Sequence, residues 1–298
     1  MYPSSFEYFR AGSLAHALEL MAQYGDDARP LAGGQSLIPL MKLRLASPAV
    51  LVDLNPLDEL AYVRQENGWL AMGALARHAE VEDSGLVRDH LPLAFDAVRL
   101  VGDAQVRNLG TVAGSLAEAD PGGDWGPALL ALGAEVTCHS TRGQRVVDAT
   151  DLFRDFYSTD LAPDELLTEV RLRVPPAGSG GAYLKLERRA GDFAVVGVAV
   201  QVTVEDRICK DIGIGLAGAG ATPIKPAAAE AALRGGKLDE ASIAEAARCI
   251  DQAIDPPTDT RASAEYRREM VGVFFRRALA KALERTSSPS PATAGEAR

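Results

Sequence analysis

AGGQS at residues 32–36 and GTVAGSLAEADPGGD at residues 110–124 are the two stretches that decide the fold of this chain. In the first, the paired glycines can make a tight turn between an expected strand at residues 29–32 and an expected helix at residues 36–45. Such a turn can bind an anionic group through backbone N–H donors and the helix dipole, and pyrophosphate is the natural candidate. A plain turn or a glycine helix cap is the alternative for this stretch taken alone.

The second stretch has the same glycine and hydroxyl character. Residues 105–116 are expected to pass from the end of a helix through Gly110 and Gly114 into a loop that a ligand could approach closely. Asp120 and Asp124 follow around a Pro-Gly turn, and a capped turn leading into the next helix would also explain them. Two such segments in one chain favour a bound ligand over two unrelated turns.

A third segment, YLKLERRAGDFA at residues 183–194, combines three cations with a carboxylate and an aromatic ring. These groups would gather at the end of a strand. A solvated charged turn between two strands is the alternative, and the segment alone does not decide between them.

The flanking patterns predict mixed helix and sheet. Ser13 offers a helix N-cap and Gly25 a stop, so a helix is expected between two strands in a small βαβ-like unit, followed by a buried strand at residues 49–55. In the next region the apolar patterns predict strands at 68–76, 133–140 and 165–175 and helices at 78–83, 92–101 and 126–132.

Prolines and glycines between Pro175 and Gly181 form the clearest break in the chain, and we expect a domain boundary there. The segments beyond it are expected to be strands at 182–189, 193–204 and 208–220, then helices at 227–233, 242–254 and 263–284. The expected domains are two N-terminal subdomains, 1–58 and 59–176, a C-terminal domain, 177–285, and a disordered tail, 286–298.

Gly213, Gly215 and Gly218 match the G-x-G-x-x-G spacing of a dinucleotide-binding turn. However, they lie late in an expected strand, and Pro223 and Pro226 interrupt the place where the phosphate-binding helix should begin. We therefore interpret them as strand glycines with close backbone neighbours.

Composition excludes several classes of partner and site. The net charge of -10 would repel nucleic acid, and the longest apolar stretch, residues 194–204, is far short of the roughly 20 residues that cross a bilayer. The N-terminus has no signal-peptide pattern, so a cytoplasmic location is expected. The three cysteines and four histidines are too scattered for a metal site, and reduced structural thiols are expected.

The three ligand-binding segments, with ELLTEVRLRVP at residues 165–175, resemble the FAD-binding medium subunit of the carbon monoxide dehydrogenase and xanthine dehydrogenase (molybdenum hydroxylase) family. The resemblance covers about residues 1–285. It implies an α+β fold: a two-part FAD-binding domain of the PCMH or vanillyl-alcohol-oxidase-like type, then a CO dehydrogenase flavoprotein-like C-terminal domain with a three-stranded antiparallel sheet and three helices.

The resemblance also implies which residues bind FAD. The two glycine-rich segments would bracket the diphosphate, Leu167 would line the cleft, and Lys185 would reach the isoalloxazine edge. The positions that carry over as cofactor-binding are Arg29, Leu31, Ala32, Gly33, Gly34, Gln35, Ser36, Leu37, Val101, Gly110, Thr111, Ala113, Gly114, Ser115, Ala119, Asp120, Gly123, Asp124, Leu167, Lys185, Asp192 and Phe193. No catalytic residue and no metal ligand is expected in this chain.

Three residues depart from the family pattern. Gln35 stands where His is frequent, and Glu118 stands where His or Asn is often seen. Ala113 stands where a second Gly is frequent. These departures put in doubt the surroundings of the flavin, and hence its reduction potential and its choice of oxidant.

The function implied is that of an electron-transfer subunit. A large molybdopterin-binding subunit would oxidise the substrate, a small subunit with 2Fe-2S clusters would relay electrons, and FAD in this chain would pass them to NAD, a quinone or oxygen. The assembly expected is a dimer of heterotrimers, a heterohexamer, either free in the cytoplasm or held by its partners at the inner face of the membrane. Carbon monoxide, purines, N-heterocycles and aldehydes are all compatible substrates. The alternatives are a standalone FAD-dependent NAD(P)H oxidoreductase and a non-catalytic assembly subunit.

Overall fold

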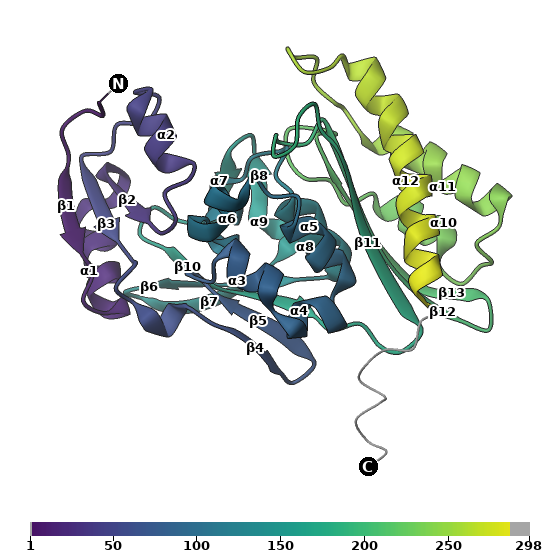
Figure 1. The fold of residues 1–298 in the computed structure, drawn as a ribbon, viewed down its shortest axis with the longest axis horizontal. Coiled ribbons are helices and arrows are strands. Elements are labelled where there is room, and N and C mark those ends of the chain that lie inside the picture. The colour runs from purple at the N-terminus through teal and green to yellow at the C-terminus, as the bar shows by residue number, and fades with distance from the viewer. Residues whose placement is uncertain (1, 287–298) are drawn as a thin grey trace.

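The structure is a computed structural model that describes residues 2–286 (Figure 1). Most of the expected disordered tail lies outside the described residues. Thr286 is the exception, since it ends a helix, and the expectation is wrong for that residue. Within residues 2–286, none of the helices combines the length and the apolar character needed to cross a bilayer.

The N-terminal part is a parallel sheet of three strands in the order β1-β3-β2, with a helix packed on it. Its elements are β1 (Glu7–Arg10), α1 (Leu14–Tyr24), β2 (Ala28–Leu31), α2 (Leu37–Lys42) and β3 (Val50–Asp53). The Ser13 hydroxyl accepts from the His16 N–H and Gly25 ends α1 with a φ of 49°, so both expected helix signals are confirmed. Helix α2 is shorter than expected, because Arg44 adopts a left-handed backbone that stops it.

A five-stranded antiparallel sheet follows, in the order β4-β5-β10-β6-β7. Its strands are β4 (Val63–Glu66), β5 (Trp69–Gly73), β6 (Glu135–Ser140), β7 (Gly143–Asp148) and β10 (Leu166–Arg173). The sequence pattern does not predict β4, because this polar edge strand has no buried face to impose an apolar alternation. Asn67 and Gly68, both with positive φ, form the hairpin turn that joins it to β5.

Short helices connect these strands and cover the sheet (Figure 1). They are α3 (His78–Asp83), α4 (Gly85–His90), α5 (Pro92–Val98), α6 (Ala104–Leu109), α7 (Val112–Glu118), α8 (Trp125–Leu132) and α9 (Ala149–Leu152), with the small strand pair β8 (Phe153–Asp155) and β9 (Ser158–Thr159). Residues 105–109 are the end of a helix, as expected, but the expectation that the chain then enters a loop around Gly114 is wrong. Thr111 accepts a hydrogen bond from the Gly114 N–H at 3.0 Å, and this N-cap starts α7 directly after the two-residue bend that ends α6.

The C-terminal part is an antiparallel sheet of three strands in the order β11-β12-β13, accompanied by three helices, as expected. The strands are β11 (Ser179–Leu186), β12 (Val196–Glu205) and β13 (Ile208–Ala217), and the helices are α10 (Ala227–Leu233), α11 (Glu240–Ala253) and α12 (Ala264–Thr286). Helix α12 packs on β11 and β12. Of the helices in the preceding part, α5 packs on β11 and α8 packs on β13.

The interpretation as strand glycines is confirmed for Gly213 and Gly215 and is wrong for Gly218, which lies in a bend after β13 with a φ of 69°. A Cβ on Gly213 would lie 2.0 Å from the Ala131 carbonyl oxygen, and a Cβ on Gly215 would lie 2.0 Å from that of Pro127. Glycine is therefore required because β13 packs directly on the backbone of α8.

Candidate functional site

The two glycine-rich segments that the sequence analysis singled out are in direct contact. A Cβ on Gly33 would lie 2.3 Å from the Leu109 carbonyl oxygen and 2.6 Å from Gly110 Cα. The Gln35 side chain also donates to the Gln105 carbonyl, at 3.3 Å. We call residues 32–36 the first bend and residues 109–111 the second bend.

The first bend leaves its backbone donors free. Among residues 2–286, the N–H groups of Gly33, Gly34, Gln35 and Ser36 donate to no protein acceptor. Gly34 has a φ of 68°, and a Cβ there would crowd the Ile38 side chain, so only glycine suits this position. Successive free N–H groups around a left-handed residue can form a concave site for an anion.

Two residues that the sequence analysis missed connect the bends. Asn55 follows β3 and donates from Nδ2 to the Ala32 carbonyl oxygen at 3.0 Å. The Arg77 guanidinium donates to Asn55 Oδ1 and to the Leu109 carbonyl oxygen. Partial burial lowers the pKa of Arg77, and nearby Glu80 and Asp53 counter this effect.

His78, the first residue of α3, is hydrogen-bonded to the second bend through its backbone. Its N–H donates to the Gly110 carbonyl at 2.9 Å, and its Nδ1 accepts from Trp125 Nε1 at 3.2 Å. Burial lowers the pKa of His78 to about 3, so the ring is neutral at physiological pH. It is a structural acceptor here and not an acid–base group.

The aspartate turn at residues 120–124 lies against the third segment. Asp124 is 5% exposed and accepts from the Tyr183 hydroxyl at 2.8 Å and from Lys185 Nζ at 3.1 Å. Burial raises the pKa of Asp124 to about 6, and Lys185 and Tyr183 oppose the rise. Lys185 also donates to the Leu100 carbonyl, so its ammonium group is held inside the protein.

The same turn contacts the loop that carries Asp192 and Phe193. The Ala194 N–H donates to the Gly122 carbonyl at 3.0 Å, and Phe193 itself is 42% exposed. On the other side, the Tyr157 hydroxyl donates to Asp120 Oδ2 at 2.6 Å.

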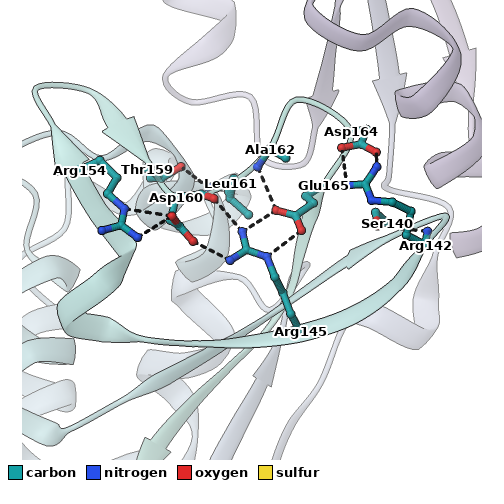
Figure 2. Close-up of polar contacts among 10 residues, drawn as sticks. All are labelled: Ser140, Arg142, Arg145, Arg154, Thr159, Asp160, Leu161, Ala162, Asp164 and Glu165. Atoms are coloured by element: carbon teal, nitrogen blue, oxygen red, sulfur yellow. Dashed lines mark hydrogen bonds and ion pairs between the residues drawn. The ribbon is translucent and has the colours of Figure 1, made fainter.

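An ion-pair network holds the segment that carries Tyr157 (Figure 2). Arg145 of β7 donates both to Asp160, at 2.6 Å, and to Glu165, at 2.6 Å, and Arg154 shares Asp160. These bonds tie residues 153–165 to the edge of the five-stranded sheet. The network therefore supports the aspartate turn indirectly, through Tyr157.

The remaining expected site residues fall into two groups. Leu31 and Leu37 flank the first bend, Ala113 and Ser115 lie in α7 after the second bend, and Ala119 and Gly123 lie on either side of Asp120. Within residues 2–286, Arg29, Val101 and Leu167 make no hydrogen bond to either bend: Arg29 bonds to the Asp26 and Ala28 carbonyls, the Val101 carbonyl accepts from Arg107, and Leu167 is buried opposite Cys138 in the sheet. Their assignment to the cofactor stays a prediction.

The residues present fit a dinucleotide diphosphate. Free N–H donors and glycines where a Cβ would intrude are the features that permit a close approach of phosphate to backbone. By contrast, residues 2–286 contain no cluster of three or more His, Cys, Asp or Glu side chains able to hold a metal ion.

Comparison with known proteins agrees with this site. Residues 4–176 match the family described as FAD binding domain in molybdopterin dehydrogenase, and residues 181–282 match the CO dehydrogenase flavoprotein C-terminal domain. The first match includes both bends and the aspartate turn, and the second includes Lys185 and Phe193.

Individual relatives are similar over almost the whole chain. The carbon monoxide dehydrogenase medium chain of Afipia carboxidovorans is 39% identical over 97% of this chain and 100% of its own length. The alpha subunit of the 6-hydroxypseudooxynicotine dehydrogenase complex of Paenarthrobacter nicotinovorans is 40% identical over 96% of this chain and 97% of its own.

A solved structure is similar over the same length. The carbon monoxide dehydrogenase of Hydrogenophaga pseudoflava, in a form that lacks the Mo-pyranopterin moiety of the molybdenum cofactor, contains a chain that matches this one with a TM-score of 0.94 and 37% identity. The match covers 96% of this chain and 99% of that chain. This chain therefore belongs to the family of FAD-binding medium subunits of carbon monoxide dehydrogenase and xanthine dehydrogenase-type molybdenum hydroxylases, and it is an oxidoreductase subunit.

Proposed function

We propose that this chain binds FAD with the diphosphate between the two bends and transfers electrons through it. Electrons would come from 2Fe-2S clusters of a small subunit and leave to an external acceptor. The observation that carries the proposal is the contact between Gly33 and Gly110 beside four free backbone N–H donors. When bound, FAD supplies the electron-transfer chemistry.

The chain's own residues hold and orient the cofactor. The first bend would give neutral N–H donors to the diphosphate, and the aspartate turn and Phe193 would form the edge at which the ring system lies. The titratable groups nearest the bends support the same role, because His78 is buried and neutral and Arg77 is occupied by two protein acceptors. Neither is placed to move a proton to a substrate.

The family suggests the partners: a large molybdopterin-binding subunit and a small 2Fe-2S subunit, in a dimer of heterotrimers in the cytoplasm. NAD, a quinone and oxygen all remain candidate acceptors. The substrate would be chosen by the large subunit, since relatives at 39% and 40% identity are named for carbon monoxide and for 6-hydroxypseudooxynicotine.

The test is to purify the full chain alone and with its co-expressed partners. The proposal predicts one FAD per chain and flavin bleaching only when the partner subunits and their substrate are added. A chain that oxidises NADH alone at the rate of the whole complex would favour a standalone oxidoreductase. A complex that assembles without flavin would favour a non-catalytic assembly subunit, and either result would contradict the proposal.

A further inference from the structure

We infer that Asn55 and Arg77 are positioning residues that set the distance between the two bends and thereby select a ligand with a diphosphate. The inference rests on the proposed FAD site. It goes beyond that site because neither side chain belongs to a glycine-rich segment.

The contacts form one continuous chain of hydrogen bonds. It starts at the carbonyl oxygen of Ala32, directly before Gly33, which accepts from Asn55 Nδ2 at 3.0 Å. Asn55 Oδ1 then accepts from Arg77, whose other nitrogen donates to the Leu109 carbonyl, directly before Gly110. This chain of hydrogen bonds thus binds each bend at the carbonyl group directly before its glycine.

Both ends of this chain of hydrogen bonds are attached to secondary structure. Asn55 also bonds to Asp53 Oδ1 at 2.6 Å, and Asp53, 5% exposed at the end of β3, accepts from the Tyr8 hydroxyl of β1. On the other side, the Arg77 N–H donates to Glu80 at 2.9 Å in the first turn of α3. The hydrogen bonds therefore attach the first bend to the parallel sheet and the second bend to α3.

A device of this kind is needed because the bends lie in different parts of the fold: the first follows β2 of the parallel sheet, and the second joins α6 to α7. Gly33 touches Leu109 and Gly110 through backbone atoms, a contact that excludes a Cβ but supplies little attraction to hold the two segments together. Without the clamp the bends would separate part of the time. A ligand that needs both bends would then bind only to the fraction of molecules in which they are together.

The dependence on ligand separates positioning from general stability. FAD carries a diphosphate that would reach both bends, whereas FMN carries a single phosphate and can engage only one. Loss of the clamp should therefore weaken FAD binding and leave FMN binding almost unchanged. A variant that is merely less well folded would bind both flavins less well.

The experiment is fluorescence titration of flavin-free full chain with FAD and with FMN. Arg77→Gln and Asn55→Ala are expected to raise the Kd for FAD roughly tenfold, which corresponds to about one molecule in ten having the bends together. Asn55→Asp keeps an acceptor for Arg77 but loses the donor to Ala32, and it is a milder second variant with a smaller rise. The double variant Asn55→Ala/Arg77→Gln should be no worse than the worse single variant, because both act through one chain of bonds.

Arg248→Gln is the matched control, since it breaks an exposed arginine–carboxylate pair with Glu245 on α11, far from the bends in sequence. It should change neither Kd. The inference is overturned if Arg77→Gln and Asn55→Ala bind FAD like the parent chain, if FAD and FMN weaken by the same factor, or if the two losses add in the double variant. A parent chain that does not bind FAD would overturn the proposed function as well, which distinguishes the two failures.

Discussion

Two glycine-rich segments of this chain look alike in sequence and differ in what their backbones do. In the first bend, Gly33 and Gly34 leave free N–H donors beside a second backbone segment. In β13, the N–H groups that do not face β12 are used: Ile214 donates to Glu230 at 2.8 Å, and Leu216 donates to the Ile224 carbonyl at 2.9 Å. Glycine spacing is therefore not the property that makes a nucleotide site.

The difference lies in the reason for each glycine. Both Gly33 and Gly215 exclude a Cβ because a carbonyl oxygen is in the way, from Leu109 in one case and Pro127 in the other. At Gly215 the close approach packs a strand on α8, and the N–H groups on either side, of Ile214 and Leu216, are both bonded. At Gly33 it brings two bends together and leaves the N–H donors of the first bend without a protein acceptor, which is the condition for binding a ligand.

Replacing one glycine in each region is the strongest way to break this comparison. Gly215→Ala should lower the free energy of unfolding by about 3 kcal/mol, because a methyl group would overlap the Pro127 carbonyl between packed elements. Gly33→Ala should instead weaken FAD binding by roughly a hundredfold with a smaller loss of stability, since its surroundings are a bend that can shift. Urea unfolding and FAD titration of both variants measure this. Equal stability losses with unchanged FAD affinity would mean that the bends have no ligand role.

Acid should loosen the second bend through His78. Because the folded-state pKa of His78, about 3, lies below the usual histidine value of 6.5, the neutral buried ring contributes stability above pH 6.5, and this contribution is lost as the pH falls toward 3. By pH 5 the lost free energy of unfolding amounts to about 2 kcal/mol. His78→Gln removes the titration, so its stability should fall less than that of the parent chain between pH 7 and pH 5.

Urea midpoints across that pH range test the prediction, with His90→Gln at the end of α4 as the control. Parallel pH profiles for the parent chain and the His78→Gln variant would show that the ring is not held neutral in the folded state.

The Thr111 cap sharpens the comparison at the start of α7. Thr111→Val keeps the shape but loses the acceptor for the Gly114 N–H, and a loss of about 1 kcal/mol in unfolding free energy is expected. The same cap holds the second bend, so FAD affinity should fall as well. Thr150→Val is a control, since Thr150 lies in the first turn of α9, remote from both bends in sequence, and its hydroxyl donates to the N-cap residue Asp148. A stability loss at Thr111 with no loss of FAD affinity would separate the cap from the site.

The smallest effect is expected at a glycine that has neither role. Gly272 lies inside α12, and a Cβ there would meet only the end of the flexible Arg276 side chain, 3.9 Å away. Gly272→Ala should therefore raise the unfolding free energy by about 0.5–1 kcal/mol, because alanine is the better helix former. A melting temperature below that of the parent chain would indicate a contact at this face that the isolated chain does not reveal.

Local signals in the sequence were enough for much of the fold. The helices α3 and α10 have the bounds that their apolar patterns predict, and Ser13 and Gly25 delimit α1 as expected. The elements that local patterns missed have little local character: β4 is a polar edge strand stabilised by pairing with β5. Helix α7 was missed because Gly114 favours a loop, whereas the Thr111 cap and the packing of α7 beside β10 decide for a helix.

The site divides in the same way. The bends and the aspartate turn could be found from glycine, hydroxyl and carboxylate patterns and from the family resemblance. Asn55 and Arg77 could not, because their bonds join positions 22 to 32 residues apart and neither residue lies in a recognisable motif. The burial of Lys185 against Asp124 also depends on the packing of β11 on α5 and of α8 on β12 and β13, which no local pattern encodes.

A crystal structure of the full chain grown with FAD tests the central claim most directly. The account predicts diphosphate oxygens within hydrogen-bonding distance of the N–H groups of Gly33 to Ser36, with Gly110 and Thr111 on the opposite side. A diphosphate bound at Gly213–Gly218, or FAD held with its diphosphate away from both bends, would contradict it.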